Sequence, residues 1–325
     1  MRRQGFGDAM LHLTEADVER LLPMDDALRE VEAALRDLGE GKAENRPRQR
    51  VRGLHALLNV MPASWPARGY YGFKEYSISR QGTRFWFHLF DGSTGEAVAV
   101  IQADRLGQRR TGAASGVATK FLSRPEASRV GIVGTGWQAE SQLEAVSRVR
   151  RISEVRCFSP QASRREAFAA KMRGILSLEV RAAGTAREAV DDADVVIAAT
   201  DASQPVILGE WLKPGVHVNA MGANRADARE LDDQAIRRCT FIAADSIEQA
   251  RLEAGDLLQP VAHGLLKWED VHELAAVVCG RMKGRTGPAD VTLFKSLGLA
   301  LEDVAVGAFV YERARKEGLG TEVSL

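Results

Sequence analysis

Residues 130–139 read Val-Gly-Ile-Val-Gly-Thr-Gly-Trp-Gln-Ala, and this stretch decides the fold. A mostly apolar run ends at Gly134-x-Gly136-x-x-Ala139, and the residues up to Val149 have a helical pattern. In such a turn the first glycine allows a tight bend, the second lets the backbone approach a pyrophosphate, and a small third residue keeps helix and strand close. The helix N-terminus then offers its free N–H groups to the phosphates. The stretch therefore predicts a dinucleotide-binding turn, with an ordinary strand–helix turn as the alternative.

The chain after this turn alternates between short apolar runs and helical stretches. Strands are predicted at residues 130–133, 155–158, 178–181, 195–199, 216–220 and 240–243, and helices at 164–172, 186–190 and 232–238 between most of them. Alternation of this kind is typical of a doubly wound parallel sheet with helices on both faces. We therefore predict an α/β Rossmann domain over residues 120–304. Its cofactor contacts are expected from Gly134, Thr135, Gly136, Gln138 and Ala139.

The residues before the turn follow a different pattern. A helix N-cap pair is expected at Thr14 and Asp17, and a second helix from Met24 to Leu38. Apolar runs separated by turn residues then predict a mostly antiparallel sheet at Val51, 57–60, 73–78, 85–90 and 97–101. A small-residue helix follows at 110–122, and the last long helix, 297–316, has no strand partner. We predict that it returns to an α+β domain made of residues 1–119 with 305–325.

Length and composition fit a globular protein of two domains. The 325 residues carry no formal net charge at neutral pH, which argues against nucleic acid or an anionic membrane as a partner. No apolar run approaches the roughly 20 residues of a membrane span, and the first residues do not resemble a signal peptide. A short disordered extension is expected before Met10. The three scattered cysteines favour a reduced, cytoplasmic protein, and the six isolated histidines predict no metal site.

The end of the second predicted strand bears on the choice of dinucleotide. An Asp or Glu is usual there when the adenosine ribose carries a free 2′-hydroxyl. This chain has Phe158-Ser159-Pro160, followed by Ser163, Arg164 and Arg165. A hydroxyl and a guanidinium suit a 2′-phosphate, whereas a carboxylate would repel it. The sequence thus predicts NADP(H) as the preferred cofactor, with NAD(H) possible, held by Ser159 and Arg164. A solvated helix face is the alternative for both arginines.

Several segments outside the turn match one protein family. They are Gly72-Phe73-Lys74-Glu75-Tyr76, Arg110-Thr111-Gly112-Ala113-Ala114-Ser115-Gly116-Val117-Ala118-Thr119-Lys120, Val218-Asn219-Ala220-Met221-Gly222-Ala223-Asn224 and Asp290-Val291-Thr292-Leu293-Phe294-Lys295-Ser296-Leu297-Gly298. With the glycine turn, they make nearly the whole chain resemble the ornithine cyclodeaminase/mu-crystallin family. The resemblance implies a homodimer whose first domain carries the substrate site and the subunit contact, and whose Rossmann domain binds NAD(P). It further implies hydride transfer between nicotinamide C4 and the α-carbon of an amino or imino acid.

Cationic residues of the first domain suit an amino-acid substrate. A guanidinium offers two parallel donors to a carboxylate, and the resemblance places Arg110 there, with Thr111 beside it. It also implies a second arginine from an early strand. Arg48 is our choice and Arg46 is nearly as good, because the alignment admits a gap there; a surface arginine is the alternative. Lys74 lies among aromatic residues, so desolvation in a closed site would ease proton release and let it orient the substrate or relay a proton. An exposed strand lysine is the alternative.

One position departs from the cyclodeaminases themselves. The resemblance implies an aspartate after the Met-Gly-Ala segment, where it activates the attacking amine or water during ring closure. This chain has Asn224, which cannot accept a proton at neutral pH. Asp227 and Glu230 are displaced by three and six positions, so either would need a different loop to take over the role.

The sequence therefore favours a reductase over a cyclodeaminase. We expect an NAD(P)H-dependent ketimine or cyclic imine carboxylate reductase, running in reverse as an amino-acid dehydrogenase, in which Asn224 orients the substrate or the nicotinamide amide. The resemblance adds Thr200 and Ser296 as cofactor contacts, and a local cap is the alternative for Thr200. A cyclodeaminase-type ammonia lyase with bound NAD and a non-catalytic, crystallin-like NADP-binding protein stay open.

Overall fold

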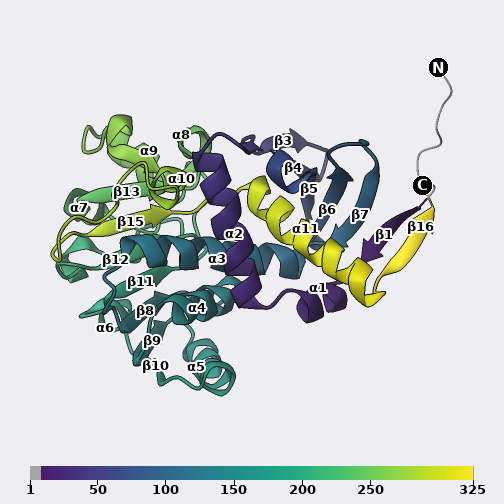
Figure 1. The fold of residues 1–325 in the computed structure, drawn as a ribbon. Helices are drawn as coiled ribbons and strands as arrows, with labels where there is room; N and C mark the ends of the chain where they lie inside the picture. Colours follow the sequence, from purple (N-terminus) through teal and green to yellow (C-terminus); the bar gives the residue numbers. More distant parts are fainter. Residues whose placement is uncertain (1–8, 325) are drawn as a thin grey trace. The chain divides into compact units, whose positions relative to one another are not determined.

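A computed structural model describes residues 9–324 (Figure 1). The chain divides into two compact units, Met1–Arg110 with Leu299–Leu325 and Thr111–Gly298. Compared with the predicted domains, residues 111–119 and 299–304 belong to the other unit. The first division falls inside one uninterrupted helix, α3 (Asp104–Leu122), so the sequence has no linker there to mark it. Most of the extension expected before Met10, residues 1–8, lies outside the described residues.

Within the described residues, the first unit forms an eight-stranded sheet. Its strands are β1 (Ala9–Leu13), β2 (Glu44–Asn45), β3 (Gln49–Arg52), β4 (Ala56–Trp65), β5 (Tyr70–Ser79), β6 (Gly82–Asp91), β7 (Ala97–Gln102) and β16 (Thr321–Ser324). They follow the order β16-β1-β7-β6-β5-β4-β2, and β3 also pairs with β4. β1 runs parallel to β7 and the other pairs are antiparallel, which confirms a mostly antiparallel sheet. The sequence pattern does not indicate β2 and β16, because both are short and largely exposed.

Helices cover one face of this sheet. α1 (Glu15–Leu21) begins with the predicted pair, in which Thr14 and Asp17 cap each other's backbone. α2 (Met24–Gly39) packs on α11 (Ala300–Glu317), and α11 packs on β4, β5 and β6 (Figure 1). A Cβ at Gly307 would lie 2.4 Å from Cε1 of Phe87, so α11 approaches the sheet this closely because residue 307 has no side chain. This contact sets the height of α11 above the centre of the sheet.

The second unit is built on a parallel sheet. Its strands are β8 (Arg129–Val133), β9 (Glu154–Phe158), β10 (Val180–Ala182), β11 (Val195–Ala198), β12 (His217–Ala220), β13 (Phe241–Ala244), β14 (Val271–Glu273) and β15 (Thr292–Lys295). The order is β10-β9-β8-β11-β12-β15-β13-β14, with each neighbouring pair parallel. The predicted doubly wound α/β fold is confirmed. The chain order reverses between β8 and β11, and ligands of such sheets bind beyond the carboxyl ends of the strands at this switch point.

Helices and apolar clusters cover both faces of the parallel sheet. The helices are α4 (Trp137–Val149), α5 (Ala162–Leu176), α6 (Ala186–Val190), α7 (Asp233–Arg238), α8 (Ile247–Glu253), α9 (Gly255–Ala262) and α10 (Leu274–Val278). Short 3₁₀ turns are η1 (Pro66–Arg68) in the first unit, and η2 (Gly209–Trp211) and η3 (Trp268–Asp270) in the second. One core cluster joins the strands to Leu143 and Phe168, and the other joins them to Ile236 and Leu257. Among residues 9–324, no helix has the length and apolar character needed to cross a membrane.

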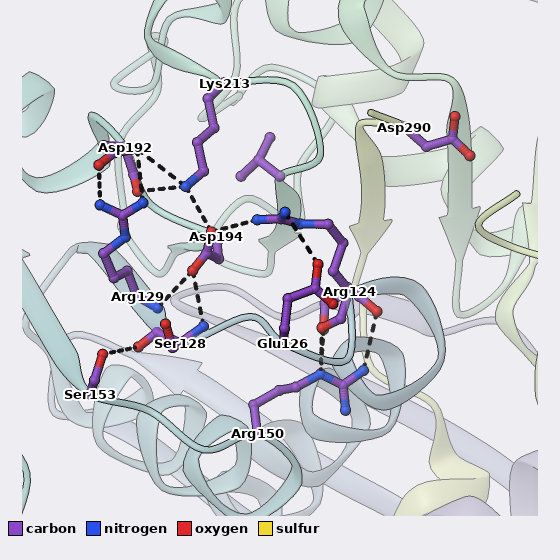
Figure 2. A network of polar contacts seen from close by, with 12 residues as sticks. Arg124, Glu126, Ser128, Arg129, Arg150, Ser153, Asp192, Asp194, Lys213 and Asp290 are labelled. Carbon is purple, nitrogen blue, oxygen red and sulfur yellow. Dashed lines mark hydrogen bonds and ion pairs between the residues drawn. The ribbon is translucent and has the colours of Figure 1, made fainter. Parts of the chain in front are cut away.

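A polar network closes the amino ends of β8 and β11 (Figure 2). Asp194 accepts hydrogen bonds from the backbone N–H groups of Ser128 and Arg129 at 2.9 and 3.0 Å. It also pairs with Lys213 and Arg124, both at 2.7 Å. Burial alone would raise the pKa of Asp194, but these contacts lower it to about 2. Because ligands of this fold bind at the opposite edge of the sheet, we assign the network a structural role.

Candidate active site

Lys74 lies in the middle of β5, on the face of the sheet that α11 covers. Its neighbours across the strands are Met61 on β4 and Phe87 on β6, and its side chain is only 3% exposed. The Nζ atom donates a hydrogen bond to Oδ1 of Asp303 at 3.0 Å and lies 5.2 Å from the ring centre of Phe85. The structure therefore places Lys74 in the interior of the first unit and not on an exposed strand surface.

Arg110 reaches the same carboxylate from α3. Its Nη1 atom donates to Oε2 of Glu302 at 2.9 Å, and its Nε atom lies 3.4 Å from Oδ1 of Asp303. Gly107, about one helical turn earlier, lies so close to Lys74 that a Cβ there would be 2.6 Å from Nζ. The helix can pass this near the lysine because residue 107 is a glycine. Lys74 and Arg110 consequently share one oxygen of Asp303.

The structure separates the two candidates for the second arginine. Arg48 is 7% exposed, and its guanidinium lies 5.9 Å from the ring centre of Tyr76, on the same face of β5 as Lys74. Its positive charge acts on Lys74 and lowers the pKa of that lysine. Arg46 is exposed and pairs with Glu44. The geometry favours Arg48 as the arginine that accompanies Arg110.

These five side chains form what we name the Lys74 cluster: Arg48, Lys74, Arg110, Glu302 and Asp303. Burial lowers the pKa of Lys74 to about 8, the carboxylate of Asp303 opposes this shift, and the charges of Arg110 and Arg48 add to it. With Lys74 protonated, three cations face two carboxylates, and an unbalanced charge is costly in a buried site. The cluster therefore suits a small ligand with a carboxylate group. Lys74 is also able to exchange a proton close to neutral pH.

Glu302 and Asp303 are functional candidates that the sequence motifs do not indicate. Both lie in the first turn of α11, where the positive end of the helix dipole stabilises acidic side chains. Glu302 is 1% exposed and Asp303 is 0% exposed. The sequence signal for them is their apolar surroundings. Leu301 precedes them and Val304 follows, within a helix that is buried on nearly all sides. Acidic residues on such a helix need cationic partners.

Thr111 follows Arg110 on α3 and is the first residue of the second unit. It is 7% exposed, and its carbonyl oxygen accepts a hydrogen bond from Nε2 of Gln142 at 3.0 Å. A Cβ at Gly112 would lie 2.5 Å from the carbonyl oxygen of Ser141. Gln142 and Ser141 both belong to α4, so α3 and α4 are in close contact directly beside the glycine turn.

The glycine turn has the geometry that phosphate binding requires. Gly134 has a φ of +100°, and a Cβ there would lie 2.1 Å from the carbonyl oxygen of Ala199. Its N–H donates to the carbonyl of Phe158 at 2.8 Å, which links β8 to β9. Gly136 is the N-cap of α4, where no side chain caps the helix among the described residues, and a Cβ there would meet nothing within 4 Å. Open space at an uncapped helix N-terminus fits a pyrophosphate.

The other residues predicted in and after this turn have distinct positions. Ala139 is fully buried in the core, while Gln138 is half-buried on the first turn of α4. The hydroxyl of Thr135 donates to that of Ser159 at 3.0 Å, so these two side chains lie together. Arg164 is exposed on α5. Its neighbour Arg165 is instead tied to the end of β9, donating to the Ser159 carbonyl at 3.0 Å.

Glu230 joins the loops that follow β11 and β12. Its Oε1 atom accepts hydrogen bonds from the N–H and the hydroxyl of Thr200, both at 2.7 Å. Its Oε2 atom accepts from the N–H groups of Gly222 at 2.7 Å and Ala223 at 3.2 Å. Burial raises the pKa of Glu230, and the charge of Lys295 opposes this shift. Because donors occupy both oxygens, Glu230 holds these loops together and is not placed to replace the missing aspartate as a base.

Asn224 and Thr200 lie on the loops that Glu230 joins. Asn224 is exposed and directly follows Ala223, while the hydroxyl of Thr200 also accepts a hydrogen bond from the N–H of Ala202 at 3.2 Å. Thr200 therefore makes the local cap that was the alternative interpretation, together with its bond to Glu230. Both residues stand beyond the carboxyl ends of parallel strands, which is the ligand side of this fold.

Ser296 lies on the loop after β15 and is 2% exposed. Its hydroxyl is 3.4 Å from Oδ2 of Asp245, the same oxygen that accepts the N–H groups of Leu297 and Gly298, each at 2.6 Å. Asp245 thus fixes this loop as Glu230 fixes the loops after β11 and β12. In the described part of the chain, no three or more His, Cys, Asp or Glu side chains gather in a group able to hold a metal ion.

The parallel sheet with its glycine turn defines a protein with a Rossmann domain. More specifically, the chain belongs to the ornithine cyclodeaminase/mu-crystallin family, whose model matches residues 8–318. This match confirms the resemblance drawn from the sequence motifs. The chain is 39% identical, over 236 residues, to delta(1)-pyrroline-2-carboxylate reductase of Bacillus cereus, and the alignment covers 72% of each protein.

Solved structures show the same likeness over nearly the whole chain. The delta(1)-pyrroline-2-carboxylate reductase of Thermococcus litoralis, in complex with NADH and L-proline, superposes with a TM-score of 0.93 at 34% identity, covering 97% of this chain and 100% of that one. An archaeal alanine dehydrogenase dimer with bound NAD superposes with a TM-score of 0.92 at 32% identity, covering 98% and 99%.

Proposed function

We propose that this protein reduces small imino acids with NAD(P)H and acts in reverse as an amino-acid dehydrogenase. The observation that supports this proposal most strongly is the Lys74 cluster. It is a buried site in which two arginines lie close to a lysine that is able to exchange a proton. The chain is an NAD(P)-dependent oxidoreductase, and its relatives include a pyrroline-2-carboxylate reductase and an alanine dehydrogenase. Their names point to substrates that share an α-nitrogen and a carboxylate.

The second unit supplies the cofactor site in this proposal. The pyrophosphate would be held by the backbone of Gly134 to Gly136 and the N-terminus of α4. Thr200, Asn224 and Ser296, on loops fixed by buried carboxylates, would surround the nicotinamide end. When bound, the nicotinamide supplies the hydride that the substrate α-carbon receives.

The first unit supplies the substrate groups. Arg110 and Arg48 would bind the carboxylate, with Thr111 beside them, because guanidinium groups match carboxylate geometry. Arg110 is already oriented by Glu302 and Asp303, so little side-chain freedom is lost on binding. Lys74 would orient the substrate and provide a proton, since its pKa of about 8 keeps it largely protonated at neutral pH while still able to release the proton.

We further propose that NADP(H) is the preferred cofactor, with NAD(H) also bound. No carboxylate directly follows β9, and the hydrogen-bonded hydroxyls of Thr135 and Ser159 lie at its end. Arg164, exposed on the first turn of α5, offers a guanidinium to a ribose 2′-phosphate. The solved relatives contain NADH or NAD, so the finer preference rests on these side chains.

A homodimer is proposed through the open face of the first unit's sheet. This face, opposite α11, carries Tyr71, Phe73 and Phe90, whose rings stack at 5.2 and 6.0 Å between centres. Val51 and Leu58 continue it and are 61% and 38% exposed. Apolar side chains exposed on one face of a sheet are typical of a subunit contact, and the alanine dehydrogenase relative is a dimer. Sedimentation should give twice the chain mass of 35.4 kDa, and a monomer would contradict the proposal.

A cytoplasmic location is proposed from the cysteines. Cys157, Cys239 and Cys279 form no disulfide in the described structure. Burial raises the pKa of the Cys157 thiol to about 11 and that of Cys239 to about 12, so both are unreactive. This usage is typical of a reducing compartment. Recovery of the protein in a secreted fraction would contradict the location.

The test of the function follows NADPH and NADH absorbance with a panel of imino acids. Pyrroline-2-carboxylate, piperideine-2-carboxylate, and pyruvate with amines would be offered, and at least one should oxidise the cofactor, faster with NADPH. Arg110→Lys should raise KM by about tenfold or more, because the two-pronged contact is lost. Arg109→Lys is the matched control, since Arg109 pairs with Glu19 on the outside of α1 and should leave kcat/KM near the wild-type value. No turnover with any imino acid would overturn the function.

The lyase alternative has a separate readout. A cyclodeaminase would convert ornithine to proline without net change in nicotinamide absorbance. Asn224 cannot act as the base in that reaction, and both carboxylate oxygens of Glu230 already accept hydrogen bonds. We therefore expect no proline to form. Proline formation by the wild-type protein would favour the lyase.

A further inference from the structure

The Asp303 carboxylate has an oxygen that the Lys74 cluster does not use. Asp303 is 0% exposed, and its Oδ1 atom faces Lys74 at 3.0 Å and Arg110 at 3.4 Å. Its Oδ2 atom is buried and accepts no hydrogen bond from any residue of the described chain. A buried anionic oxygen without a donor is destabilising, because it has lost the water that would solvate it. A ligand that brings a hydrogen-bond donor to Oδ2 would remove this cost.

We propose that Oδ2 of Asp303 accepts the N–H of the substrate's α-nitrogen, which makes Asp303 the group that binds the imino or amino nitrogen. This inference rests on the proposed function and deepens it. An α-imino or α-amino acid carries a carboxylate and a nitrogen on the same carbon. Arg110 and Arg48 match the first group, and the Asp303 oxygen without a hydrogen-bond donor matches the second, which is cationic when protonated.

Other acidic or polar candidates in the molecule are less suited to this task. Asn224, at the position where cyclodeaminases have aspartate, is an uncharged amide. Glu230 accepts hydrogen bonds at both oxygens, two from Thr200 and two from backbone N–H groups of Gly222 and Ala223. Glu302 accepts a hydrogen bond at Oε2 from Nη1 of Arg110 at 2.9 Å and so stabilises the guanidinium. Asp303 combines negative charge, complete burial, an oxygen without a hydrogen-bond donor and contact with Lys74.

The proposal also gives the reaction its proton. Reduction breaks the C=N π bond, the α-carbon receives a hydride, and the nitrogen must end with one more proton than a neutral imine has. The reduced nicotinamide is the electron donor and is oxidised. Lys74, held 3.0 Å from Oδ1 of Asp303, would first protonate the lone pair of the imine nitrogen, and the iminium N–H formed in this step is the one that Oδ2 accepts. Hydride addition to the α-carbon then gives the amine, and Lys74 is left as a neutral amine, which solvent reprotonates. Asp303 keeps the nitrogen beside Lys74 and stabilises its positive charge as it becomes protonated.

The test compares ligands that differ only at the ring nitrogen. L-Proline and cyclopentanecarboxylate have the same ring size and the same carboxylate, but the second has CH₂ in place of the nitrogen. Binding would be measured by calorimetry on the full-length protein saturated with NADH, a combination in which no reaction proceeds. The wild-type protein should bind proline about tenfold or more tightly than cyclopentanecarboxylate, as a charge-assisted hydrogen bond requires.

Two variants separate binding of the nitrogen from binding of the carboxylate. Asp303→Asn keeps the shape and removes the charge, so the preference for proline should fall to about twofold or less while cyclopentanecarboxylate still binds. Glu302→Gln is the matched control, because Glu302 acts on Arg110, and it should weaken both ligands by a similar factor. An equal loss of both ligands in Asp303→Asn would overturn the inference and leave the proposed function standing.

A wild-type series keeps the inference testable if Asp303→Asn does not fold. Tetrahydrofuran-2-carboxylate places an ether oxygen, which accepts but cannot donate, where proline has its nitrogen. It should bind more weakly than cyclopentanecarboxylate, because two acceptors would face each other. A wild-type protein that binds the three ligands equally would overturn the inference. Failure to bind any of them, together with no imino-acid reduction, would overturn the proposed function as well.

Discussion

Replacing each of the two glycines of the 130–139 turn by alanine should affect a different property of the protein, either its stability or its cofactor binding. Gly134 has a φ of +100°, and its Cβ would lie 2.1 Å from the carbonyl oxygen and 2.6 Å from the carbonyl carbon of Ala199. Gly136 has a φ of −86°, and its Cβ would meet nothing within 4 Å. Gly134→Ala should therefore damage the fold of the second unit, whereas Gly136→Ala should leave the fold intact and damage cofactor binding.

The size of each effect follows from these contacts. A non-glycine residue at a left-handed φ costs about 1–3 kcal/mol, and moving a backbone carbonyl out of the way of a methyl group costs about 1–3 kcal/mol more. Gly134→Ala should thus lower Tm by an amount on the order of 10 °C for a unit of this size. Gly136→Ala should be neutral or stabilising by up to about 1 kcal/mol, because its φ suits alanine. Losing even one charge-assisted phosphate contact at this helix N-terminus should weaken NADPH by roughly 10- to 100-fold.

Thermal unfolding and fluorescence titration with NADPH together give the answer. Gly174→Ala is the matched control, because Gly174 lies at an exposed position of α5 and its Cβ would also meet nothing within 4 Å. It should stabilise slightly and leave NADPH affinity unchanged. Unchanged NADPH affinity in Gly136→Ala would refute the assignment of the turn as the pyrophosphate site. Unchanged stability in Gly134→Ala would refute the steric argument.

Two pH dependences follow from buried titratable groups. Burial lowers the pKa of Lys74 to about 8, and the proton donor is the protonated form, so kcat/KM for imine reduction should be flat below about pH 8 and fall about tenfold per unit above it. Lys74→Met should lose most activity at every pH, and a wild-type rate that rises through this range would contradict the role. Burial likewise lowers the pKa of His217 to about 3, between Thr292 and Asn219. Because the unfolded chain takes up this proton near pH 6.5, His217 contributes stability that is present above that pH and is lost as pH falls toward 3, by about 1.4 kcal/mol per unit. Urea unfolding at several pH values should show the stability gap to His217→Gln narrowing on acidification, and a constant gap would contradict the assignment.

Local sequence patterns predicted the fold well where strands are apolar runs. The first six strands of the second unit, β8 to β13, were all predicted. Four of them, β8, β11, β12 and β13, are buried on both faces of the sheet and so have no polar alternation to obscure the apolar run. β15 was not predicted as a strand, although Thr292–Lys295 is buried throughout. It ends in Lys295, which is fully buried and pairs at 2.9 Å with Asp256, 39 positions earlier. A partner this distant cannot be inferred from a local window.

Some residues of the candidate site could likewise be predicted from the local sequence, and others could not. The aromatic residues around Lys74 in the sequence favoured a closed site over an exposed strand position, and the side chain is buried. Its neighbours Tyr71 and Phe73 nevertheless lie on the opposite face of the sheet, and the ring closest to its Nζ atom in the described contacts is Phe85. The choice between Arg48 and Arg46 needed the structure, since only burial and the contact with Tyr76 distinguish them. Asp303 was out of reach, because its partner Lys74 lies 229 positions away. Local composition therefore identifies residues with apolar neighbours. Ion pairs between residues far apart in the chain can be identified only from the three-dimensional structure.

The carboxylates of the Lys74 cluster explain how a cationic site can select amino acids over simple acids. Glu302 and Asp303 offset most of the charge of Arg48, Lys74 and Arg110, which reduces the general attraction for anions. What remains is a pattern, with guanidinium donors at one place and a buried carboxylate oxygen close by. A simple carboxylate satisfies only the first feature and leaves the oxygen without a donor, at a free-energy cost of about 1–3 kcal/mol. A ligand with a carboxylate and an N–H on one carbon satisfies both, so the acidic residues contribute specificity where cations alone would contribute only affinity.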